Sequence, residues 1–239
     1  MDIDDSLPET FSTDHLVKLG LYKKVCKEFI ISSELQSCDI PDQVTQNKIL
    51  KDWCLNSGIH DKKQLFDWLD QNFLNQQELQ DLINKKWLWN KWCLEKFKNQ
   101  ISDYYFERKK SLDKVTYSLC RVKEEGLALE LFLRIKENEA SFYDIALKYS
   151  EGPERKTGGL IGPVELGVPH PKISKLLQES DQNKLLAPRK IDNWWVLLRL
   201  EKLESTGLNS DVSQKLSLEL GELYLNKAIK DFYKKKLLL

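Results

Sequence analysis

The sequence predicts an all-helical N-terminal domain, then an α+β domain with the element order β-α-α-β-α-β, then a C-terminal helix. Apolar residues recur at helical spacing through the first 110 residues, which hold only two of the ten glycines and two of the seven prolines. In contrast, residues 152–167 hold five glycines and residues 153–188 hold five prolines, as is typical of a turn-rich region. The predicted divisions of the chain are 1–110, 111–204 and 205–239.

Four helices are predicted in the N-terminal domain from the spacing of apolar residues. The clearest is 62–74, where apolar side chains follow Leu65 at i+1, i+4 and i+8, with charged residues opposite. The longest pattern, Gln76 to about Lys109, would extend about 45–50 Å if unbroken and would then link the two halves. Its tryptophans are interpreted as packing residues rather than as a cation-binding cage. The predicted helices are 16–30, 44 to near Gly58, 62–74 and 76–109, and the tryptophans are Trp87, Trp89 and Trp92.

The second half of the chain alternates between strand and helix patterns. Its first strand is rich in β-formers, and its last is a continuous apolar run of the length of a central strand. Ser141 is predicted to cap a short helix, with Asp144 in a capping-box-like position. The predicted elements are a strand at 115–122, a helix at 128–135, the helix after Ser141, a loop at 151–171 around Leu160-Ile161, a helix at 172–178, a strand at 193–200 and a helix at 208–236.

Charge and hydropathy disfavour two classes of function. Lysine plus arginine total 37 and aspartate plus glutamate total 37, so the basic excess typical of nucleic-acid binders is absent. No apolar run approaches the roughly 18–20 residues that cross a bilayer. The start, MDIDDSLPETF, is acidic where a secretory signal would be basic. We therefore expect no membrane span and a cytoplasmic location, with signal-independent export left open.

The cysteines and histidines suggest neither disulfides nor a metal. Five cysteines occur without a CxxC or Cys/His cluster, which favours free thiols in a reducing compartment. The three histidines are far apart in sequence. We expect no metal and no organic cofactor.

Three motifs occur in order in the second half. Phe142–Ser150 fits the pattern F-x-x-x-A-x-x-x-S, Gly158–Gly162 forms a glycine turn around Leu160-Ile161, and Pro171 opens the next helix two residues before Ile173. With Pro188 before the last strand, residues 112–203 resemble the parvulin family of peptidyl-prolyl cis/trans isomerases. The whole layout is similar to bacterial chaperone-isomerases of the SurA and PrsA kind. This resemblance implies a chaperone-like helical domain on which the C-terminal helix packs, and unfolded or proline-containing polypeptides as partners.

The resemblance also assigns site positions, at which this chain departs from the family. The two family histidines correspond to Leu119 and Val196, and the cysteine-or-aspartate region reads Glu151-Gly152. The methionine and phenylalanine of the proline pocket correspond to Pro169 and Ile173. The expected catalytic positions are therefore Leu119, Glu151 and Val196, and the expected substrate-binding residues are Val164, Pro169, His170, Ile173 and Trp195.

Three functions stay open at this point. Isomerisation breaks no covalent bond and requires loss of amide resonance, a barrier of about 18–20 kcal/mol, so an apolar, dry pocket can catalyse it without a nucleophile or base. The first hypothesis is therefore an isomerase and folding chaperone. The second is a weak or inactive parvulin-like domain that binds peptides, because the polar positions are replaced. The third is an interaction scaffold whose helical domain is the working part.

Overall fold

The computed structural model describes residues 12–237, which form two compact units. One unit combines the described residues up to Ser102 with those from Asn209 onward, and the other spans Asp103–Leu208. The predicted boundary between residues 110 and 111 falls inside a helix, α6. No helix in the described range is both long and apolar enough to cross a bilayer.

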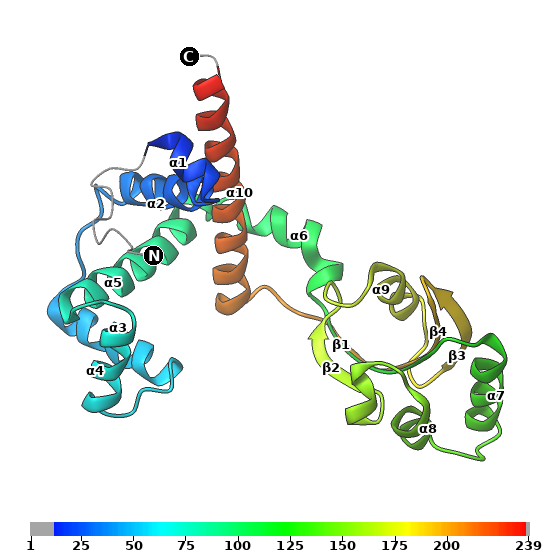
Figure 1. Ribbon diagram of the computed structural model, residues 1–239. Coiled ribbons are helices and arrows are strands. Elements are labelled where there is room, and N and C mark those ends of the chain that lie inside the picture. The colour runs from blue at the N-terminus through cyan, green and yellow to red at the C-terminus, as the bar shows by residue number, and fades with distance from the viewer. Residues whose placement is uncertain (1–11, 238–239) are drawn as a thin grey trace, which may run out of the picture. The chain divides into compact units, whose positions relative to one another are not determined.

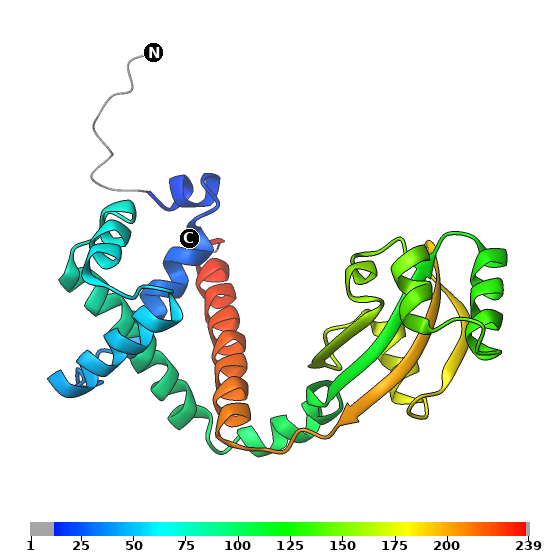
Figure 2. The ribbon, with the colours of Figure 1, turned by 90° about the horizontal axis from the view of Figure 1, so that it is seen from below.

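The first unit is made of helices only (Figures 1 and 2). The C-terminal helix α10 packs against α5 and α2, and α3 packs against α5. A Cβ added to Gly221 of α10 would lie 2.6 Å from the Sγ of Cys93 on α5, so this position needs glycine for close helix contact. The helices are α1 (Thr13–Lys18), α2 (Tyr22–Glu34), α3 (Gln43–Asn56), α4 (Lys62–Gln71), α5 (Gln76–Phe97) and α10 (Ser210–Leu237).

The core of this unit has two clusters. The larger joins α2, α5 and α10, and contains Ile30, Ile31, Leu35, Trp89, Cys93, Phe97, Leu225 and Ile229. The smaller surrounds Leu69, Leu79 and Ile83. Trp89 is buried and stacks on Trp92 at 4.7 Å between ring centroids, which agrees with a packing role for these two tryptophans.

Three of the predicted helices are shorter than expected. The pattern at 16–30 is two helices, because Gly20 adopts φ +70° and separates α1 from α2. The pattern at 62–74 ends at Gln71, and Phe73, with φ +55°, is 94% exposed rather than part of the apolar stripe. The pattern at 76–109 breaks between Phe97 and Ile101, where neither glycine nor proline marks the interruption in sequence.

The second unit contains a four-stranded antiparallel sheet with the strand order β2-β1-β4-β3 (Figure 1). The predicted α+β class is thus confirmed, with one strand more than expected. That strand, β3, contains Pro188, which lacks a backbone donor and is tolerated because β3 is an edge strand with an irregular register there. The elements are α6 (Ile101–Leu112, of which the first two residues belong to the first unit), β1 (Lys114–Val122), α7 (Glu125–Lys136), α8 (Phe142–Tyr149), the 3-10 helix η1 (Pro153–Thr157), β2 (Leu160–Glu165), α9 (Pro171–Gln178), β3 (Leu185–Ile191) and β4 (Trp194–Glu204).

The sheet separates two apolar clusters. On one face, Cys120, Val122 and Leu197 pack with residues of α7 and α8. On the other, Leu119, Val196 and Leu198 pack with residues of α9. Because successive strand side chains point to opposite faces, Trp194 belongs to the α9 face and Trp195 to the α7–α8 face.

Candidate active site

A cavity of about 380 Å³ lies on the α9 face of the sheet. Its walls come from β1, the start of α9, the turn between β3 and β4, and the start of β4. The volume is within the range of small-ligand sites. The lining residues are Leu119, Arg121, His170, Ile173, Ile191, Asp192, Asn193, Trp194 and Val196.

The floor of this cavity is apolar. Leu119 of β1 and Val196 of β4 lie on strands that pair with each other, with Ile173 of α9 and Ile191 of β3 beside them in the same cluster. All four side chains are at least nine-tenths buried. An apolar ring that binds on this floor is removed from water, and the burial of its surface favours binding. The floor therefore provides the apolar contact that a proline ring needs.

The polar side of the cavity contains an ion pair. Arg121 donates from Nε and Nη2 to the two carboxylate oxygens of Glu154, at 2.9 and 2.8 Å. The hydroxyl of Ser150 donates to the same carboxylate at 2.6 Å. The Glu154 side chain is 1% exposed and that of Arg121 29% exposed. The arginine is therefore held by a buried anion while part of it stays accessible.

His170 is occupied by local interactions. It caps α9, because its Nδ1 accepts from the backbone N–H of Lys172 at 3.3 Å. Its Nε2 lies 3.3 Å from a carboxylate oxygen of Asp192 in the β3–β4 turn. Both ring nitrogens of His170 thus lie next to groups of this rim, Nδ1 at the backbone of Lys172 and Nε2 at Asp192. The imidazole therefore shapes the rim of the cavity, with one of its nitrogens used to cap α9.

Two glycines of the glycine turn are required by close backbone contact. Gly159 has φ +85°, and a Cβ there would lie 2.7 Å from the carbonyl oxygen of Leu119 and 2.8 Å from the Cβ of Ala146. Gly162 has φ +122°, and its Cβ would lie 2.5 Å from the carbonyl oxygen of Val115. These close contacts hold β2 against β1 and so position Leu119 in the floor of the cavity.

Of the residues predicted for the site, Leu119, Val196, His170 and Ile173 line the cavity. The other four do not. Trp195 packs on the opposite face of the sheet, because the alternation of β4 sends it toward α7 and α8.

The remaining three lie near the cavity's elements without lining it. Val164 pairs with Val115 along β2 and packs into the apolar cluster. The carbonyl of Pro169 accepts from the hydroxyl of Ser174. Glu151 is exposed and accepts from the backbone N–H of Lys123 at 3.0 Å.

Sequence reasoning missed Arg121 and assigned Trp195 to the site in place of its neighbour Trp194, although the signal was present. Each lies two residues from a predicted site position on the same strand, Arg121 from Leu119 and Trp194 from Val196. Residues i and i+2 of a strand share a face. Asp192, by contrast, enters the site through a turn with φ +53°, which no strand pattern reveals.

The nearby thiol is not a nucleophile for this site. Cys120 is fully buried on the α7–α8 face, and burial raises its pKa to about 11. It is therefore protonated at neutral pH. No group of three or more histidine, cysteine, aspartate or glutamate side chains within residues 12–237 could hold a metal ion. The cavity offers shape, apolar contact and hydrogen-bond donors.

The sheet, the glycine turn and the apolar cavity beneath α9 define a parvulin-type domain. Residues 120–202 match the sequence profile of the rotamase family, described as the PPIC-type PPIase domain. The chain therefore carries a PPIC-type peptidyl-prolyl cis/trans isomerase domain, and the predicted family resemblance is confirmed. Polypeptides are the substrates of such a domain.

The comparison with solved structures gives matches to a peptidylprolyl isomerase and to chaperones, each with a TM-score below 0.5. The peptidylprolyl isomerase PrsA of Bacillus anthracis is 17% identical, with a TM-score of 0.48, and the match covers 91% of this chain and 97% of that one. PrsA of Bacillus subtilis is 17% identical, with a TM-score of 0.35 and coverage of 93% and 84%. A SurA-like chaperone of Campylobacter jejuni is 19% identical, with a TM-score of 0.38 and coverage of 90% and 92%. No curated protein sequence matches the chain.

Proposed function

We propose that this protein is a folding chaperone that accelerates cis/trans isomerisation of prolyl bonds in polypeptides. The observation that carries the proposal is the apolar floor of the cavity, made by Ile173 and Val196 inside the matched isomerase domain and by Leu119 directly before its first matched residue. The proline ring binds on this floor. The flanking peptide crosses the rim at Trp194 and His170.

The chemistry fits a site without a nucleophile. The prolyl amide is planar because nitrogen shares its lone pair with the carbonyl, and twisting it costs about 18–20 kcal/mol. A dry apolar floor disfavours the charge-separated planar form, and contacts that fit the twisted bond better lower the barrier. Replacing the family histidines by Leu119 and Val196 removes hydrogen bonds but keeps this apolar contact. We therefore propose catalysis by desolvation and by a donor from another residue.

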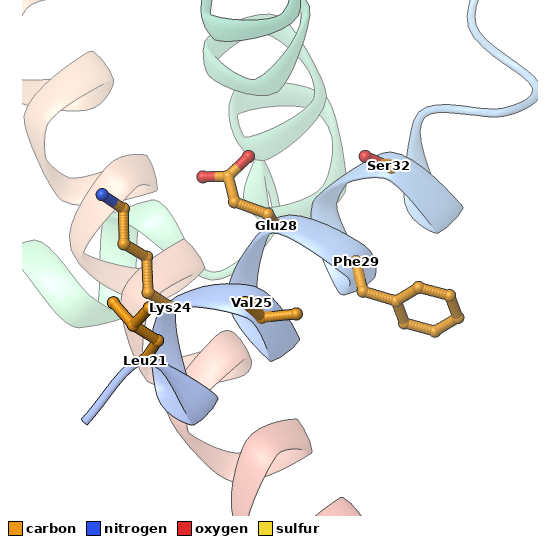
Figure 3. A pocket seen from close by; sticks show the side chains of 6 residues that line it. All are labelled: Leu21, Lys24, Val25, Glu28, Phe29 and Ser32. Carbon is orange, nitrogen blue, oxygen red and sulfur yellow. The ribbon is translucent and has the colours of Figure 1, made fainter. Parts of the chain in front are cut away.

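The helical unit supports the chaperone part of the proposal through exposed apolar surface. Leu21, which caps the start of α2, is followed at i+4 and i+8 by Val25 and Phe29 of that helix, and the three side chains are 42–64% exposed. They line a hollow of about 520 Å³, and Figure 3 shows Val25 and Phe29 projecting from one side of the helix, with Lys24 and Glu28 on another. An apolar stripe beside charged side chains suits an extended, unfolded segment.

The five cysteines support a reducing location. All are free thiols, including Cys93 and Cys120, which are fully buried. Free cysteines persist where glutathione and thioredoxin keep them reduced. We propose a cytoplasmic location on this ground, to be checked by cell fractionation.

A protease-free assay with an Ala-Leu-Pro-Phe peptide tests the isomerase. The full chain should speed cis-to-trans relaxation. Ile173→Asp should abolish the effect, because it places a carboxylate on the apolar floor. Ile173→Ala should reduce it while leaving the far-UV circular dichroism unchanged. Lys175→Asp is the matched control, since its side chain lies on the same helix, 75% exposed and outside the cavity.

The alternatives give different results. A binding-only domain would leave relaxation unchanged and still suppress aggregation of a denatured client. A scaffold would respond in neither assay and would copurify with a defined partner through residues 1–110. Either outcome would refute prolyl isomerisation by this chain.

A further inference from the structure

We propose that Arg121 is the catalytic hydrogen-bond donor of this site, and that its free guanidinium N–H bonds the prolyl nitrogen as the amide twists. This inference rests on the proposed isomerase function. It assigns to Arg121 the polar role that Leu119 and Val196 cannot perform.

The position of Arg121 suits this role. It follows Leu119 by two residues on β1, so both side chains lie on the cavity face of the sheet. Val196 is directly opposite Arg121 in the β1–β4 pairing. The guanidinium therefore extends from a strand position next to both replaced histidines, two residues after Leu119 and opposite Val196.

The guanidinium is held in place before a substrate binds. Nε and Nη2 donate to Glu154, whose carboxylate is 1% exposed and also bonded by Ser150. This fork–fork geometry fixes the orientation of the guanidinium plane. Within the described residues Nη1 has no hydrogen-bond partner, so its two N–H groups remain for a ligand in the cavity that Arg121 lines.

Gly152 leaves the space that this pair needs. A Cβ at Gly152 would lie 2.4 Å from Nε of Arg121 and 2.3 Å from a carboxylate oxygen of Glu154. Any side chain there would displace the ion pair. Gly152 belongs to the Glu151-Gly152 region, where this chain departs from the family motif. Because it has no side chain, it leaves room for Arg121 and Glu154 to pair.

The ion pair of Arg121 and Glu154 has no net charge, and this determines which hydrogen-bond acceptors it favours in a substrate. Glu154 neutralises Arg121, so the pair attracts a free carboxylate weakly but still presents oriented N–H groups. The nitrogen of a planar amide is a poor acceptor, because its lone pair is delocalised into the carbonyl. On twisting, the lone pair localises on nitrogen. A donor aimed there stabilises the transition state more than the bound ground state, which raises kcat rather than tightening binding.

The test removes both charges, so that no unpaired buried ion remains. Arg121→Gln/Glu154→Gln should lower kcat/KM for Ala-Leu-Pro-Phe about 10- to 100-fold, as expected for one charged hydrogen bond. The peptide Kd, followed by NMR titration, should change less than threefold. Arg199→Gln/Glu201→Gln is the matched control on the opposite face, with a 2.8 Å ion pair and an arginine 30% exposed, and should keep wild-type kinetics.

Should the double variant fail to fold, Arg121→Lys replaces it. A single ammonium group can pair with Glu154 but lacks the second, outward set of donors, so kcat/KM should still fall at least tenfold. A folded variant within threefold of wild-type kcat/KM overturns the assignment. So does a loss confined to an Ala-Glu-Pro-Phe peptide, or a loss explained by Kd alone. Absence of activity in the wild-type chain would instead refute the proposed function itself, and the role of Arg121 with it.

Discussion

Replacing Glu154 by glutamine should destabilise the isomerase domain far more than the same change at Glu151, three residues earlier. Glu154 accepts from Arg121 at 2.9 and 2.8 Å and from Ser150 at 2.6 Å, in a side chain that is 1% exposed. Glutamine keeps the shape. It loses the charge, and it turns an amide N–H₂ toward the donors of Arg121.

The magnitude follows from burial. Removing one partner of a buried ion pair costs about 3–5 kcal/mol. Arg121 is 29% exposed and regains some hydration, so we expect about 2–4 kcal/mol. Glu151 is 40% exposed and lies 4.0 Å from the ammonium of Lys123, a surface pair worth about 0–1 kcal/mol.

Hydrogen exchange of the full chain measures this difference, because it reports on each unit separately. Peptides covering β1 and β4 should lose protection about 30- to 700-fold in Glu154→Gln. In Glu151→Gln the loss should be at most about fivefold. Equal losses of protection in the two variants would show that the buried ion pair does not stabilise the domain. They would also contradict the conclusion that Glu154 fixes the orientation of Arg121.

Two further predictions concern stability. Leu69→Ala should lower the free energy of unfolding in urea by about 2–4 kcal/mol, because Leu69 is 3% exposed. Phe73→Ala should change it by less than about 0.5 kcal/mol, because Phe73 is 94% exposed. Similar losses in the two variants would show that Phe73 belongs to the apolar stripe after all. Burial raises the pKa of Cys120 from 9.0 to about 11. Between these pH values the unfolded state loses the thiol proton while the folded state keeps it, so the free energy of unfolding falls as the pH rises. Between pH 8 and 10.5, Cys120→Ala should lose about 2 kcal/mol less than the wild type, and parallel losses would contradict the shift.

Local sequence signals predicted most of the elements in the second unit. Ser141 caps α8 as expected, accepting from the backbone N–H of Asp144 at 3.0 Å. The apolar run after Asn193 is the central strand β4. Capping and alternation are properties of neighbouring residues, so they can be predicted without tertiary structure.

Long helical patterns were less reliable. The apolar spacing continues through 76–109 although the chain breaks after Phe97, because both helices bury a face with the same period. Likewise the spacing at 62–74 includes Phe73, which lies beyond the end of α4. Periodicity reports which residues could share a face, not where the helix ends.

The sequence by itself determined the domain family, the glycine turn and the apolar floor, since these depend on residue types at fixed spacing along the chain. Only the tertiary structure decided which polar groups reach the cavity. Arg121 and Glu154 are 33 residues apart and meet over Gly152. Trp194 faces the cavity and Trp195 the other cluster. Contacts between distant segments depend on strand register and on the space left by neighbouring side chains, which a linear pattern does not contain.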